Sequence, residues 1–124
     1  MSCELVGTVF ILPLTPVKVM VDNPVDITGR YTLNGPGSGG PGCTYAMNWV
    51  HDSPGFPYSF ANEDPVAPDT DYVKTWLATL PIGEHRFHVD VTHTDPNIPA
   101  VFITSSQTIV VEVIRRIEPA RFPD

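Results

Sequence analysis

Apolar and polar side chains alternate along several short segments of this chain. In residues 25–33 the apolar Val25, Ile27, Tyr31 and Leu33 occupy odd positions, whereas every even position is polar or charged. Successive side chains of a β-strand point to opposite faces, so a period of two predicts a strand with one buried face. Similar alternation in other segments indicates an all-β protein.

The other segments with this character bring the predicted number of strands to about seven. Their expected bounds are 5–12 with 17–21 as one interrupted strand, 43–51, a short edge strand at 58–60, 72–80, 84–93 and 107–114. Pro13 and Pro16 interrupt the first strand, and proline cannot donate to a ladder. We therefore expect that strand to lie at an edge or to switch sheets there.

One face of each strand supplies the expected core. Besides the residues named for 25–33, the inward positions are Tyr45, Met47, Trp49, Tyr72, Trp76, Ala78, Leu80, His85, Phe87, Val89, Val91, Ile109, Val111 and Val113. The spacing in 72–80 also fits a helix face. Residues 35–42 are almost all Gly or Pro and predict an exposed loop, which is either a tolerated insertion or a conformable contact loop.

Three features resemble immunoglobulin-like domains of the bacterial and phage type. They are Trp49 on the third strand, the corner Leu-Pro-Ile-Gly-Glu-His at 80–85, and the closing strand. In that fold a buried Trp of the third strand fills the space between two sheets. The resemblance covers about residues 5–114, favours a strand at 72–80, and implies an immunoglobulin-like β-sandwich of about seven antiparallel strands. The paired cysteines of antibody domains are absent at the matching strands.

Length and charge bound the organisation of the chain. Its 124 residues suit one two-layer domain, which we place at 1–114, followed by an extended arm at 115–124. The net charge of −7 speaks against nucleic acids and anionic membranes as partners, since both attract positive proteins. The apolar run at 9–12 is short and ends at Pro13, so neither a signal peptide nor a membrane span is expected.

No motif for catalysis, a cofactor or a metal emerges. The sequence lacks Gly-x-Ser-x-Gly and a phosphate-binding glycine loop. His85 and His93 lie roughly 26 Å apart along one strand, too far to share an ion. His88 and Asp90 are expected to be solvated residues of the outward face. The acidic residues of 63–71 do not match an EF-hand.

The two cysteines, Cys3 and Cys43, fit no zinc motif. Because no export signal is seen, we expect synthesis in a reducing cytoplasm, and there free thiols are favoured. A disulfide between the two stays open as the alternative.

The arm is the predicted partner-binding segment. It interleaves arginines with apolar residues, and its two prolines disfavour a helix. Arginine forks pair with carboxylates and apolar side chains anchor a contact, so such an arm suits the surface of another protein. The residues expected to bind are Arg115, Arg116, Ile117, Arg121 and Phe122.

A stand-alone sandwich with a terminal arm resembles phage virion accessory proteins, and function then follows by analogy. The expectation is a non-enzymatic structural protein that decorates or cements a capsid, or joins a tail. It would bind the major capsid or tail protein in many copies, without a cofactor, in a virion assembled in the host cytoplasm. The alternative is a carbohydrate-binding or adhesion module that uses Phe56, Tyr58 and Phe60, and a small hydrolase is a third possibility.

Overall fold

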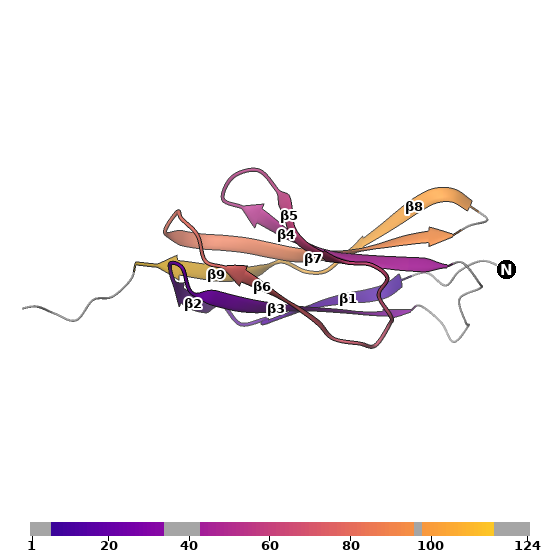
Figure 1. Ribbon diagram of the computed structural model, residues 1–124, viewed down its shortest axis with the longest axis horizontal. Helices are drawn as coiled ribbons and strands as arrows, with labels where there is room; N and C mark the ends of the chain where they lie inside the picture. Colours follow the sequence, from indigo (N-terminus) through magenta and orange to yellow (C-terminus); the bar gives the residue numbers. More distant parts are fainter. Residues whose placement is uncertain (1–5, 34–42, 96–97, 116–124) are drawn as a thin grey trace, which may run out of the picture.

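The computed structural model describes residues 6–33, 43–95 and 98–115, and within these ranges the protein is built of strands and turns without a helix (Figure 1). The strands are β1 (Val6–Leu12), β2 (Val17–Met20), β3 (Pro24–Leu33), β4 (Thr44–Ser53), β5 (Tyr58–Glu63), β6 (Tyr72–Leu77), β7 (Gly83–Asp95), β8 (Ile98–Ser105) and β9 (Ile109–Ile114). The all-β prediction is confirmed.

The strands form two sheets, as in a β-sandwich. The smaller sheet has the order β1-β3-β6, and the larger has the order β2-β9-β7-β4-β5, with β8 also paired to β7. Neighbours are antiparallel except for β2 and β9, which run parallel. Figure 1 shows the two sheets as two layers, and the buried apolar side chains of both fill the space between them.

The predicted interruption of the first strand is a change of sheet. Residues before Pro13 form β1, which pairs with β3 in the smaller sheet. Residues after Pro16 form β2, which pairs with β9 in the larger sheet. Two prolines cannot take part as donors in a ladder, so the chain leaves one sheet and enters the other where they occur.

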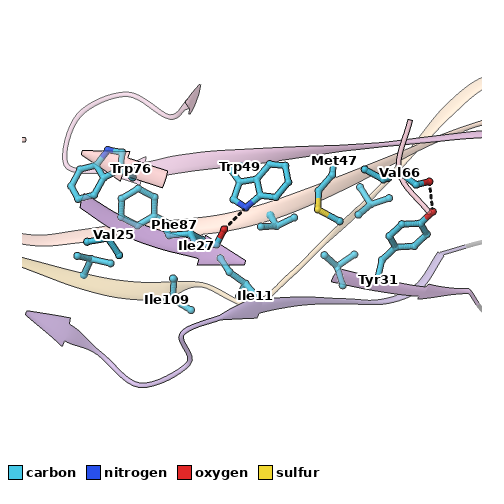
Figure 2. Close-up of a cluster of buried hydrophobic side chains, with 14 of the residues drawn as sticks. Ile11, Val25, Ile27, Tyr31, Met47, Trp49, Val66, Trp76, Phe87 and Ile109 are labelled. Atoms are coloured by element: carbon cyan, nitrogen blue, oxygen red, sulfur yellow. Dashed lines mark hydrogen bonds between the residues drawn. The ribbon is translucent and has the colours of Figure 1, made fainter. Parts of the chain in front are cut away.

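The core is arranged around Trp49, whose side chain is fully buried between the layers (Figure 2). Its Nε1–H donates to the Ile27 carbonyl at 3.0 Å, which ties β4 to β3 across the sandwich. The Tyr31 hydroxyl donates to the Val66 carbonyl at 2.8 Å, and burial raises the pKa of this hydroxyl. Both polar groups of these aromatics are therefore satisfied inside the core.

The strand predicted at 72–80 ends earlier than its pattern suggested. β6 ends at Leu77, so Leu80 is 69% exposed instead of lining the core. Hydrogen bonds of Ala78 with Asp22 and Asn23 end the strand by tying it to the turn before β3.

The closing segment is two strands, β8 and β9, and β8 was not predicted as a separate element. Both pair with β7, and the chain is interrupted between them at Ser106. The Ser106 amide donates to the Val89 carbonyl, and its Oγ accepts from the Val89 amide. This local exchange of bonds replaces the regular ladder. Because the first predicted strand is divided and β8 lies where no strand was predicted, the described residues form nine strands where about seven were expected.

The expectation of free thiols is wrong for Cys43, which is disulfide-bonded. The described residues include no free cysteine, and Cys3 lies outside them. The expectation rested on the compartment assumed for the protein. Whether a thiol is paired depends instead on which residues the fold brings within bonding distance, and spacing in sequence does not show that.

Candidate functional site

The arm predicted to bind a partner leaves the sandwich at the end of β9. Ile114 is fixed there, since it pairs with Met20 and its carbonyl accepts from the Val21 amide at 3.1 Å. Arg115 follows and is exposed. The other predicted contact residues, Arg116, Ile117, Arg121 and Phe122, lie outside the described residues. The structure thus locates the base of the arm and its first arginine.

Two exposed apolar side chains lie near this base. Leu80 and Ile82, which we call the apolar rim, are 69% and 41% exposed. Leu80 and Ile82 lie in the turn before Gly83, which pairs with Val113 near the end of β9. Phe56 is 91% exposed in the turn that follows β4, and β4 is separated from β9 by β7. Figure 1 shows the turn between β6 and β7 beside the end of β9.

A buried pair of histidines lies beneath the rim. His51 of β4 and His85 of β7 are 3% and 1% exposed, and His51 Nε2 lies 2.8 Å from His85 Nδ1. His85 Nε2 lies 2.7 Å from the Pro81 carbonyl, which can only accept. His85 therefore donates from Nε2, and in its singly protonated form it accepts at Nδ1 from His51 Nε2–H.

The surroundings of His51 oppose its protonation. Its Nδ1 is buried with no hydrogen-bond partner among the described atoms. Trp76 and Phe87 pack on the ring at centroid distances of 5.6 and 4.8 Å. Burial, followed by the closeness of His85, lowers the pKa of His51, while Asp52 acts weakly in the opposite direction. Burial therefore favours the uncharged form of the His51 ring.

His88 has the opposite environment: it lies on the outward face as expected, but it is partly buried between two aspartates instead of solvated. On the outward face of the larger sheet its Nδ1 lies 2.7 Å from Asp52 and its Nε2 lies 3.0 Å from Asp90. Burial disfavours the charged ring, but hydrogen bonds and the charges of both aspartates outweigh it and raise the pKa of His88. Asp52 comes from the neighbouring strand β4, a juxtaposition that the alternation of residues along β7 does not reveal.

His93 is the third buried histidine, and neither of its ring nitrogens has a hydrogen-bond partner among the described atoms. Its ring stacks on Tyr45 at a centroid distance of 4.9 Å and lies 5.9 Å from Phe102. It thus serves as an aromatic filler at this end of the core. Within the described ranges, no three His, Cys, Asp or Glu side chains gather to hold a metal ion.

The three aromatics of the alternative hypothesis do not share one surface. Phe56 and Tyr58 are 91% and 48% exposed on the hairpin of β4 and β5. Phe60 is half-buried, and its ring packs on Phe87 of the core at a centroid distance of 5.7 Å. The centroid of the Tyr58 ring lies 5.0 Å from that of the buried His51 ring. At most two of these rings are available to a ligand.

A groove of about 490 Å³ runs between β1 and the segment that joins β8 to β9. Its lining residues carry no charge and are Gly7, Thr8, Val9, Phe10, Ile11, Leu12, Leu14, Thr104, Ser105 and Gln107. Sequence analysis did not find this groove. The signal that was present is the lack of any charged residue from 6 to 12 and from 98 to 107.

The described parts of the chain hold no helix that could cross a bilayer. No protein-family model matches the chain, and no curated protein matches its sequence.

Proposed function

We propose that this chain is a non-enzymatic accessory protein of a phage virion that decorates or cements a capsid, or joins a tail. The proposal combines an immunoglobulin-like sandwich with a docking arm that binds the major capsid or tail protein. The step from fold to virion is an analogy, so the support has to come from the surfaces that would bind.

The proposed immunoglobulin-like topology is supported by the strand order. In such sandwiches the second and fifth strands share one sheet, and the third, sixth and seventh share the other. Here β3 pairs with β6 in the smaller sheet, while β4, β7 and β9 are neighbours in the larger one. The split of the first strand places β1 beside β3 and β2 beside β9.

A second point of support is the corner before β7. Immunoglobulin-like domains carry there a tyrosine whose hydroxyl bonds to the backbone a few residues upstream. His85 takes this place, and its Nε2–H donates to the carbonyl of Pro81, four residues earlier, at 2.7 Å. Two residues later, where antibody domains have a cysteine, this chain has the fully buried Phe87. The buried Phe87 ring thus occupies the position of one of the two cysteines that form the disulfide in antibody domains.

The observation that carries the docking proposal is the position of the apolar rim at the base of the arm. Leu80 and Ile82, which are 69% and 41% exposed, lie at the end of the sandwich where β9 is followed by Arg115. Large apolar side chains gathered on a surface mark interaction sites. The arm and the rim together would offer a partner an arginine-rich segment next to an apolar contact surface.

The test is binding to purified empty capsids and tails of the phage that encodes the chain, measured by co-sedimentation. We compare the full chain, a chain lacking 115–124, and a control in which Arg115, Arg116 and Arg121 become Lys. Loss of occupancy on deletion, with partial binding of the Lys control, is the expected result. Failure of the full chain to bind either particle refutes the virion role, and unchanged occupancy after deletion refutes the arm as the anchor.

A carbohydrate-binding or adhesion module is the second candidate. It is supported by Phe56 and Tyr58, two exposed aromatics on one hairpin that suit stacking on sugar rings. A glycan array probed with the full chain tests it. Binding that Tyr58→Ala abolishes and Tyr58→Phe preserves would favour this candidate, and an array without signal would reject it.

A further inference from the structure

Two strand edges border the uncharged groove. Within the described residues, β1 pairs with β3 on one side only, and β8 pairs only with β7. β1 also lies against β7 and β8 of the other sheet. The free side of an edge strand presents every second N–H and C=O to its surroundings. The groove is therefore an opening between two sheets in which backbone donors and acceptors are available.

These two edges lack the charged residues that the other edge strands of the described fold carry. Lys18 of β2, Glu63 of β5 and Lys74 of β6 place a charge on each of the remaining edge strands. β1 and β8 contain no charged residue. Natural proteins usually guard an edge with charges, because an unguarded edge recruits another strand. Both uncharged edges of the described fold meet at the same groove.

The lining sets the chemistry of an occupant. Val9 and Ile11 form the buried floor, while Phe10, Leu12 and Leu14 are 45%, 47% and 56% exposed. The remaining contacts are hydroxyl and amide groups, and no charge is present in a protein whose net charge is −7. An occupant with a charge in the groove would lose its hydration without gaining a partner. Complementarity of charge therefore selects an uncharged segment.

We propose that this groove receives an extended β-strand donated by a partner protein, which pairs with the free edge of β1. Apolar, uncharged side chains at every second position of that strand would enter the groove and lie over Val9 and Ile11. The lining from Gly7 to Leu14 spans roughly 26 Å at about 3.3 Å per residue, so about eight residues would be bound. The inference does not rest on the virion role.

The sequence of this chain disfavours two other occupants. Its own arm carries three arginines and two prolines, which an uncharged groove and a ladder both oppose. A second copy has two uncharged edge strands, β1 and β8, but each would bring its own sheet with it and could not enter an opening between two sheets as a single strand. A strand from a partner that is extended before binding meets neither obstacle.

The experiment selects strands without assuming a partner. Random peptides of about ten residues are displayed and selected on the full chain, and enriched peptides are synthesised with blocked ends. Affinity is measured for the wild type, Thr8→Lys, Gln107→Lys and a matched control, Thr79→Lys, in which an exposed threonine of a distant turn receives the same charge. Melting curves confirm that each variant is folded, and Gln107→Lys, which lies outside the strands, keeps the test valid if Thr8→Lys is not.

The expected result is a consensus that alternates apolar and other residues without charge at the apolar positions. Its affinity should fall roughly tenfold or more in both groove variants and stay unchanged in the control. Bound peptide should also slow hydrogen exchange of amides in β1. An absence of enriched peptides, a charged consensus, or equal affinity for all variants would overturn the proposal. So would concentration-dependent dimers of the wild type that Thr8→Lys abolishes, because a second copy would then be the occupant.

Discussion

The stability of this protein should pass through a maximum near pH 6.5, the ordinary pKa of histidine. Two histidines with opposite environments determine this. His51 is buried as a neutral ring with a lowered pKa, and His88 is held between two aspartates with a raised pKa. A change of pH alters the protonation of both rings, and each histidine determines the slope of stability against pH on one side of the maximum.

On the acid side, His51 destabilises the fold. Its folded pKa lies below that of the unfolded chain, so between the two values the unfolded state binds more protons. Above about pH 6.5 His51 costs no stability, and the free energy of unfolding falls as the pH drops from there toward the folded pKa. One such group gives a slope of up to about 1.4 kcal/mol per pH unit. The cause is the ring's burial beside His85, where a second proton finds no acceptor.

On the alkaline side, His88 has the opposite effect on the pH dependence of the free energy of unfolding. Its folded pKa lies above the unfolded value, so the folded state binds more protons between the two. Its contribution is fully present below about pH 6.5 and is lost as the pH rises through the folded pKa. The limiting slope is again about 1.4 kcal/mol per pH unit, since one proton is exchanged.

The assay is urea unfolding followed by tryptophan fluorescence at steps between about pH 5 and pH 8.5. His88→Gln should flatten the alkaline limb and leave the acid limb in place. His51→Gln, which keeps a donor toward His85, should reduce the acid limb and leave the alkaline one. A wild-type free energy of unfolding that keeps rising below pH 6 would refute the reasoning, as would variants that each flatten the wrong limb.

Three substitutions test the packing and the surface. Trp49→Phe leaves the Ile27 carbonyl without its indole donor and opens space in the core, so urea unfolding should show a loss of about 2–4 kcal/mol; a loss below about 1 would contradict the bond's role. Gly29→Ala would place a Cβ 2.5 Å from Met47 Sδ, so we expect a loss of about 1–3 kcal/mol, partly recovered by adding Met47→Val; no recovery would argue against this clash. Arg30→Ala removes an exposed ion pair and should change stability by less than about 1 kcal/mol in thermal melts; a larger loss would show that solvent screening was overestimated.

The alternation of residues was sufficient to predict the class of the fold and most of its core. A period of two identifies the buried face of a strand whatever its neighbours are, and so Ile27, Met47, Trp49 and Phe87 were placed inside correctly. The interruption at Pro13 was also predictable, because a missing N–H acts locally, although an edge position and a change of sheet were both open. Both inferences depend on residues that are close in sequence.

The features that distinguish this protein depend instead on strand pairing. His51 and His85 are 34 positions apart and meet because β4 and β7 are neighbours in one sheet. Asp52 reaches His88 for the same reason, and this reverses the character expected for a surface histidine. Register and sheet order bring such groups together, and a local pattern carries no information about either.

The arm and the groove also combine a signal in the sequence with a position that only the fold determines. The composition of residues 115–124 marked a binding segment, but only the pairing of β9 with β7 places its base beside the apolar rim. The lack of charge in β1 and β8 is visible in the sequence and has no meaning until both prove to be edges of one opening. The order of residues along each strand determines which of its faces is buried. The surfaces that several strands form together depend on long-range contacts, and these form only when the two sheets pack on each other.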